Sequence, residues 1–207
     1  MRIWSTLALA FVLIGCQRHS SEANAEPQAH EQAPQEETTP GLTLSEQVVE
    51  LGPPHSRVLV HVPSDWNAVA GGSFFSADKT GEFNVQVIAG EDSASVQALI
   101  ESDRAAEIAA TTTTNQSTGE LPPARAESLG SGPSETGVQW MSFRVTVPES
   151  VSEDQHFWYS PRWTATAYLH PVGAPFYVKT QVTMSPDTPS EHFEVLQGAI
   201  QRTRLAP

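Results

Sequence analysis

The sequence predicts an α+β fold: a largely antiparallel β-sheet with two main packed helices, in an α/β/α-sandwich-like arrangement. Two observations lead to this class. Several short runs alternate apolar with polar residues, and short turns separate them, as in antiparallel strands with one buried face. Two other segments repeat apolar residues at helical spacing, one in the middle of the chain and one at its end.

Three strands are expected before the first helix. The first covers residues 57–62 and ends at Pro63, the second covers 73–75, and the third covers 83–87. Residues 78–81 read Asp-Lys-Thr-Gly, which is typical of the turn between two hairpin strands. We therefore expect these strands to form one three-stranded opening unit.

A helix is expected next, because Asp92 and Ser93 can each cap a helix N-terminus. Threonines at 111–114 are β-branched and are expected to end it. The apolar residues at helical spacing, which should face the sheet, are Val96, Leu99, Ile100 and Ile108.

Four strands are expected after this helix. Residues 124–128 form a short one, and the Gly-Ser-Gly-Pro segment at 130–133 is expected as a turn. Three longer alternating runs follow, and the loop 171–175 joins the last two as a hairpin; they cover 138–147, 163–169 and 176–182.

The closing helix has a clear N-terminal signal. Thr188 is expected as its cap, Pro189 as its first helical residue, and Glu191 as the partner that completes a capping box. Its apolar stripe, which can lie on the sheet, consists of Phe193, Leu196 and Ile200.

The N-terminus predicts export and lipid attachment. An apolar run follows Arg2, is too short to span a membrane, and ends Leu13-Ile14-Gly15-Cys16. This ending resembles the bacterial lipobox, in which the cysteine thiol receives acyl chains such as palmitate. Cys16 is the single cysteine, so no intrachain disulfide is expected.

Three regions are therefore expected: a lipoprotein signal peptide at 1–15, a disordered tether at 16–40, and a single globular domain at 41–207. The tether prediction rests on residues 17–40, which contain no Leu, Ile, Val or aromatic residue to bury. Gln17 after the lipidated cysteine resembles an outer-membrane address, so the expected location is the cell envelope, at the outer membrane.

The charge balance excludes one class of partner. The formal net charge is −13, from 24 acidic and 11 basic residues. Such a chain repels phosphate backbones, so no nucleic-acid partner is expected. It also lacks the basic patch that adsorbs to anionic lipids, so attachment to the membrane is expected through the lipid on Cys16.

The order of the expected elements, together with Val60-His61-Val62-Pro63-Ser64-Asp65-Trp66, resembles the PsbP-like superfamily. Its members include extrinsic photosystem II subunits and bacterial lipoproteins such as DcrB. The resemblance covers residues 42–205. It implies a non-enzymatic accessory domain that binds a larger partner.

No motif for catalysis, a metal or a cofactor is present, so none is expected. Three of four histidines could meet across a sheet as metal ligands. Their spacing matches no ligand motif, and solvated histidines are the favoured interpretation; they are His55, His61, His156 and His170.

The most unusual segment is His156-Phe157-Trp158-Tyr159-Ser160-Pro161-Arg162-Trp163. Clustered aromatic residues with arginine are typical of recognition surfaces, so the candidate binding residues are Trp158, Tyr159 and Arg162. The alternative is structural: Phe157 and Trp163 lie in the core, while Trp158 and Tyr159 cover the sheet edge.

Two functions follow from these observations. The leading hypothesis is a membrane-anchored cell-envelope lipoprotein that acts as a non-catalytic protein-interaction or accessory module, with an envelope protein as partner. The alternative is a small-ligand or glycan-binding lipoprotein that uses the segment 156–163. A flat apolar patch there favours a protein partner, whereas a concave pocket favours a ligand.

Overall fold

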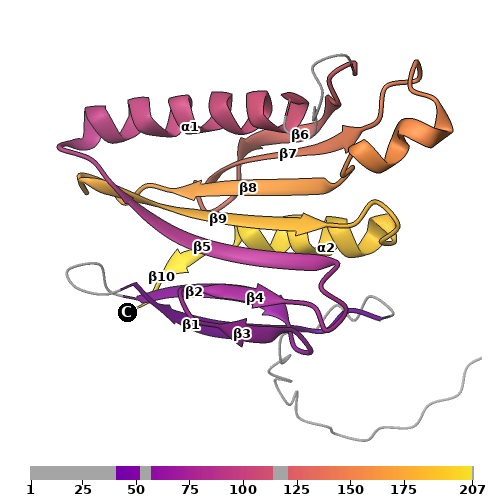
Figure 1. Cartoon of the computed structure of the whole chain (residues 1–207). Helices are drawn as coiled ribbons and strands as arrows, with labels where there is room; N and C mark the ends of the chain where they lie inside the picture. Colours follow the sequence, from indigo (N-terminus) through magenta and orange to yellow (C-terminus); the bar gives the residue numbers. More distant parts are fainter. Residues whose placement is uncertain (1–40, 52–56, 114–120, 207) are drawn as a thin grey trace, which may run out of the picture. The chain divides into compact units, whose positions relative to one another are not determined.

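The computed structural model describes residues 41–51, 57–113 and 121–206, which belong to the unit Glu37–Pro207. The predicted signal peptide at 1–15, Cys16 and the tether at 16–40 lie outside the described residues. Figure 1 shows the elements, which in chain order are β1 (Leu44–Glu50), β2 (Arg57–Pro63), β3 (Asn67–Val69), β4 (Ser73–Phe75), β5 (Gly81–Ala89), α1 (Ser93–Thr113), β6 (Arg125–Pro133), β7 (Gln139–Thr146), the 3-10 helix η1 (Glu153–Trp158), β8 (Trp163–Leu169), β9 (Phe176–Met184), α2 (Ser190–Gln201) and β10 (Arg204–Leu205).

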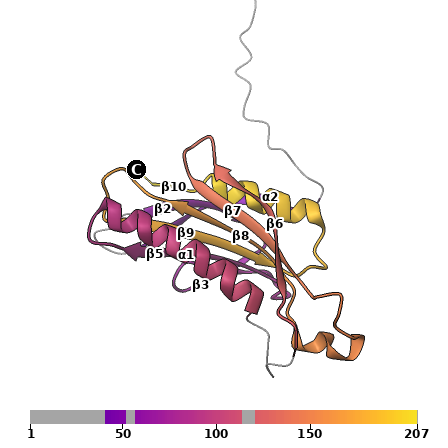
Figure 2. The ribbon, with the colours of Figure 1, turned by 90° about the horizontal axis from the view of Figure 1, so that it is seen from above.

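A seven-stranded sheet organises this unit. Its strand order is β3-β4-β5-β9-β8-β7-β6, and every neighbouring pair is antiparallel. The two main helices pack on opposite faces of this sheet, as the helices in Figure 2 show. The predicted α+β class, with a largely antiparallel sheet between two helices, is therefore confirmed.

The strand β9 shows how the two faces differ. Its even-numbered residues, such as Val178 and Val182, join the main core with α2. Its odd-numbered residues face α1, where Tyr177 packs in a second core and Lys179 meets acidic side chains of the helix. Because successive side chains of a strand point to opposite faces, one strand contributes to both layers.

The main core lies between the seven-stranded sheet, α2 and a second, three-stranded sheet. The stripe predicted on α2 is confirmed, since Phe193, Leu196 and Ile200 are buried there. The ring of Phe193 packs edge-on against Trp163 of β8, with ring centroids 5.2 Å apart.

The predicted three-stranded opening unit is wrong. Strands β4 and β5 belong to the seven-stranded sheet, but β2 pairs with β1 and β10 in the separate sheet. The turn after Pro63 redirects the chain at the end of β2. Strand β1 was not predicted because its sequence, Leu-Ser-Glu-Gln-Val-Val-Glu, has little apolar alternation, and its stability comes from pairing along all of β2.

The start of α1 agrees with the prediction. The carboxylate of Asp92 accepts a hydrogen bond from the backbone N–H of Ser95 at 2.7 Å, and the Ser95 hydroxyl accepts one from the Asp92 N–H at 2.9 Å. Val96 and Ile100 are buried against the sheet, as expected. Leu99 and Ile108, however, are exposed, because the stripe that meets the sheet continues through polar residues instead.

Two local predictions were wrong. Residues 130–133 continue β6, after a bulge between Ser128 and Gly130, and the turn is formed by Ser134 to Gly137. The backbone φ of Gly130 is +150°, which glycine tolerates in extended chain. The helix α2 begins at Ser190, with Pro189 as an extended cap residue and no side-chain cap, so the predicted capping box does not form.

Candidate binding surface

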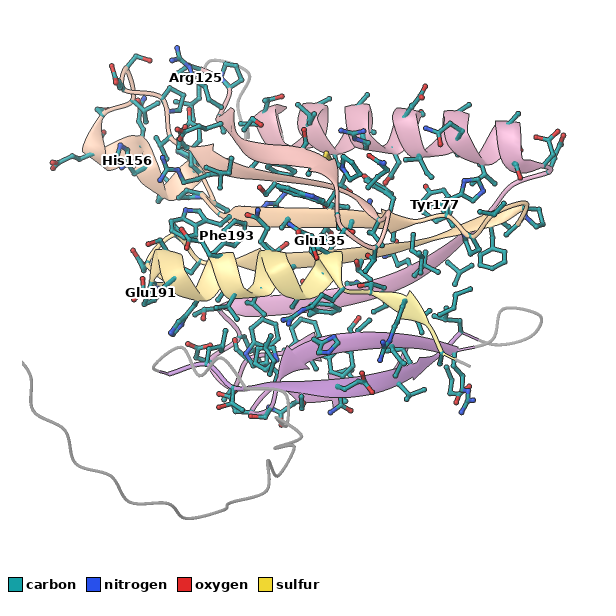
Figure 3. All side chains as sticks on the ribbon, turned by 180° about the vertical axis from the view of Figure 1, so that it is seen from behind. Arg125, Glu135, His156, Tyr177, Glu191 and Phe193 are labelled. Carbon is teal, nitrogen blue, oxygen red and sulfur yellow. The ribbon has the colours of Figure 1, made fainter. Side chains whose placement is uncertain are left out.

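The aromatic segment lies in the connection from β7 to β8, at one end of the seven-stranded sheet (Figure 1). It contains the 3-10 helix η1, and His156 of η1 lies at the same end of the unit as Arg125 of β6 (Figure 3). The connection returns to the sheet where the backbone N–H of Val145 donates to the carbonyl of Arg162 at 2.7 Å. Regular sheet structure therefore anchors both ends of this loop.

Phe157 and Trp158 form an exposed aromatic pair at the end of η1. Their side chains are 72% and 40% exposed, and their ring centroids lie 4.5 Å apart with an angle of 38° between the planes. The structural alternative for this segment placed Phe157 in the core, and that part is wrong. Trp163 does pack on the core, through Phe193.

Tyr159 was predicted as a binding residue, but the structure buries it. Its side chain is only 6% exposed, and its hydroxyl donates to the carbonyl of Pro122 at 2.6 Å. The ring packs in a small apolar cluster with Leu121, Ala124, Val145 and Val151. Tyr159 therefore supports the loop from beneath and does not lie on its surface.

Of the other two predicted binding residues, Trp158 is on the surface and Arg162 is half-buried. The aromatic pair directly precedes buried Tyr159, whose backbone N–H donates to the carbonyl of His156 at 3.0 Å. The end of η1 is thus fixed by a backbone hydrogen bond and by a buried side chain. A pair held in this way loses little conformational freedom when it binds a partner.

The histidines do not come together as a metal site. His61 lies on β2, His156 on η1, and His170 near the β8–β9 turn, where its Nε2 lies 3.1 Å from the Ala174 carbonyl. His55 lies outside the described residues. Within the ranges that the structure describes, no group of three or more His, Cys, Asp or Glu side chains could hold a metal ion.

A second polar cluster, which the sequence analysis missed, lies between α1 and the sheet. Lys179 of β9 is 8% exposed, and its Nζ lies 2.9 Å from Asp103 Oδ2 and 2.5 Å from Glu107 Oε1. The Gln181 amide donates to Glu107 at 3.1 Å and to the Thr166 hydroxyl at 3.3 Å. This ion cluster attaches the second half of α1 to the sheet.

Electrostatics and burial oppose each other at Lys179. Burial lowers its pKa, but hydrogen bonds and charges from Glu107 and Asp103 outweigh burial, so the pKa lies above its ordinary value. Nearby, burial and the Asp103 carboxylate raise the pKa of the Tyr168 hydroxyl far above its usual range. Lys179 therefore stays protonated and ion-paired, which suits a structural contact better than proton transfer.

One signal in the sequence could have revealed this cluster. Asp103 and Glu107 follow Val96 and Ile100 at helical spacing, so they continue the stripe that faces the sheet. Acidic residues on a buried stripe need a partner, and Lys179 is the basic residue of the strand opposite.

A third polar group lies on the three-stranded sheet. His61 Nε2 is 3.9 Å from a Glu46 carboxylate oxygen, which also accepts from Arg204 at 3.1 Å. Burial and the charge of Arg202 lower the pKa of His61, and Arg204 lowers it further, whereas Glu46 opposes this shift. His61 is therefore neutral in the folded protein at neutral pH.

Comparisons with known proteins identify the fold. A scan of protein-family models and a search of curated proteins give no match to the sequence. Among solved structures, cyanobacterial PsbP (CyanoP) from Synechocystis sp. PCC 6803 matches with a TM-score of 0.50 and 12% identity, over 84% of this chain and 100% of that one. LpqN from Mycobacterium tuberculosis, described as involved in cell envelope biogenesis, gives a TM-score of 0.47 and 16% identity, over 79% and 92% of the two chains.

The described unit is thus an α+β domain with a PsbP-like fold, and the resemblance found in the sequence is confirmed at the level of the fold. At these identities the likeness says nothing of activity or partner. Among the described residues, no helix is long and apolar enough to cross a membrane.

The ion cluster predicts a large effect of one lysine. Replacing Lys179 with Met should lower the free energy of unfolding by about 3–5 kcal/mol, because two carboxylates then face each other without their cation. Urea denaturation measures this value. Lys79→Met, at a lysine exposed on the β4–β5 turn, is the matched control and should change stability by less than about 0.5 kcal/mol.

A Lys179→Met protein as stable as wild type would contradict this account of the cluster. The combined variant Lys179→Met/Asp103→Leu/Glu107→Leu provides a second check. It should recover most of the lost stability, because no buried charge remains unpaired.

The environment of His61 predicts acid sensitivity. The pKa of His61 is lower in the folded than in the unfolded chain, so the unfolded chain binds the proton more readily. Neutral His61 makes its full contribution to the free energy of unfolding above about pH 6.5. This contribution is lost as the pH falls from there toward the folded-state pKa of His61. Chemical denaturation between pH 5 and pH 8, in about half-unit steps, should show this loss.

His61→Gln should flatten the stability profile over that window, and His156→Gln, at an exposed histidine, should not. Equal slopes in wild type and His61→Gln would show that this histidine does not cause the acid sensitivity.

Proposed function

We propose that this chain is a membrane-anchored cell-envelope lipoprotein whose PsbP-like domain acts as a non-catalytic accessory module that binds an envelope protein. The observation that carries the proposal is the exposed pair of Phe157 and Trp158 on a loop with a buried support. Large aromatic side chains that protrude from a fixed loop are typical anchors of protein interfaces.

The N-terminal sequence supports the location. An apolar run followed by Leu13-Ile14-Gly15-Cys16 is the pattern of a lipidated export signal, and Gln17 favours the outer membrane. Several acyl chains on Cys16 would give stable attachment, so the domain needs no membrane-binding surface of its own. The folded unit would then be free to contact a partner near the membrane.

The edges of the seven-stranded sheet, which carries the aromatic pair, favour recognition through side chains over strand addition. At one edge, β6 contains a bulge between Ser128 and Gly130 and ends at Pro133. At the other edge, β3 is only three residues long. Bulges, proline and short edge strands all disfavour the addition of a further strand to this sheet, so the aromatic pair is the better contact at this sheet.

The glycan alternative uses the same residues differently. A sugar ring stacks best on one open aromatic face, whereas Phe157 and Trp158 turn toward each other at 4.5 Å with tilted planes. This arrangement makes a compact knob, which suits an apolar pocket on a protein better than a flat sugar ring. Binding to envelope glycans without any protein partner would support the alternative.

Chemical crosslinking in the native host tests the interaction. Full-length protein should capture a reproducible envelope protein, and Phe157→Ala/Trp158→Ala should reduce that capture at least tenfold, because the anchor side chains are gone. Val172→Ala is the control, since Val172 is another exposed apolar residue but lies in the β8–β9 connection. Capture that is unchanged in the double variant would contradict the proposal, as would no capture by wild type.

The lipid anchor has its own test. Mass spectrometry of the mature protein should find acyl chains on an N-terminal Cys16, and density-gradient fractionation should place the protein with outer-membrane markers. Cys16→Ser removes the thiol that carries the lipid, so this variant should no longer be found with outer-membrane markers. An unmodified Cys16, or a variant that stays at the outer membrane, would contradict lipid anchoring.

A further inference from the structure

We propose that the partner surface bound by Phe157 and Trp158 is a protein pocket with a basic side chain at its rim, which pairs with Asp154. This inference rests on the proposed function, because it names the chemistry of the partner at the same surface. The spacing of the residues along η1 supports this inference.

In a 3-10 helix, side chains three positions apart lie above one another. Since η1 covers Glu153–Trp158, Asp154 lies on the same side of this helix as Phe157. Phe157 is the more exposed residue of the aromatic pair. A surface that covers Phe157 must therefore also meet the carboxylate of Asp154.

Asp154 has no partner of its own among the described residues. Its side chain is exposed, and none of the described ion pairs or side-chain hydrogen bonds involves it. A carboxylate buried at an interface without a partner costs free energy, whereas one that meets a lysine or arginine contributes to affinity and to the association rate. The complementary surface is therefore basic beside its apolar pocket.

The surrounding charges agree with this assignment. The loop from Glu149 to Arg162 has three carboxylates, those of Glu149, Glu153 and Asp154, and one guanidinium group. When Arg125 at the same end is counted as well, carboxylates still outnumber guanidinium groups by three to two (Figure 3).

The same charges argue against a lipid surface as the occupant. Insertion of Phe157 into a bilayer would bring Asp154 to the head groups, where anionic lipids repel it, and η1 contains no lysine or arginine that offsets this repulsion. A protein pocket can instead place a cation opposite Asp154.

Site-specific photocrosslinking in the host tests the inference. Full-length protein with p-benzoylphenylalanine in place of Phe157 forms covalent adducts with either protein or lipid at this position. Asp154→Asn should lower the yield of the protein adduct about tenfold, because the carboxylate is lost while the shape is kept. Asp154→Glu should restore most of the yield. Asp65→Asn, an exposed aspartate after β2, is the matched control and should have no effect.

Salt dependence gives a second readout on the same adduct. Raising the salt in isolated envelopes from ~50 mM to ~500 mM should lower the yield for wild type, and much less for Asp154→Asn. Mass spectrometry of the adduct should place a lysine or arginine of the partner next to the crosslinked peptide.

The outcomes separate this inference from the proposed function. A protein adduct whose yield is the same in Asp154→Asn and at both salt concentrations would overturn the inference while the interaction itself stands. Adducts with lipid alone would overturn both, because position 157 would then contact the membrane. Absence of any protein adduct in wild type would also overturn both.

Discussion

The alternation of side chains along β9 is the constraint on which the rest of this fold depends. This strand is central in the seven-stranded sheet, and α2 packs over one of its faces while α1 packs over the other. Val178 and Val182 contribute to the core under α2, while Tyr177 and Lys179 face α1. A shift of one residue in its register would place Lys179 in the apolar core and the valines opposite the carboxylates of α1, so the register of β9 with its neighbouring strands is strongly specified.

The two helices are attached by different physical means. α2 packs through an apolar stripe, so its contact is strong and insensitive to charge. α1 has apolar contacts at Val96 and Ile100, and its second half is attached by the ion cluster around Lys179. The candidate binding surface needs neither helix directly. It depends on the β7–β8 connection, where Tyr159 and its apolar neighbours support the aromatic pair.

The sequence was most informative where one face of an element is apolar. Strands such as β5 and β7 to β9, and the stripe of α2, could be predicted because burial imposes a regular alternation. β1 and β10 could not, because pairing with β2 stabilises them and their own residues are largely exposed. At the site, the sequence marks the segment 156–163 as unusual because aromatic residues cluster there. Which of its rings is buried depends on Pro122, which is far away in the sequence and whose carbonyl accepts a hydrogen bond from the Tyr159 hydroxyl.

The most direct test of the account is hydroxyl-radical footprinting of the full-length protein, purified and in the intact envelope of its host. Phe157 and Trp158 should oxidise readily in the purified protein and become protected in the envelope, whereas Met184, in the core, should stay protected in both. Equal oxidation of Phe157 and Trp158 in the two preparations would show that nothing covers the aromatic pair, and would contradict its role as a docking surface.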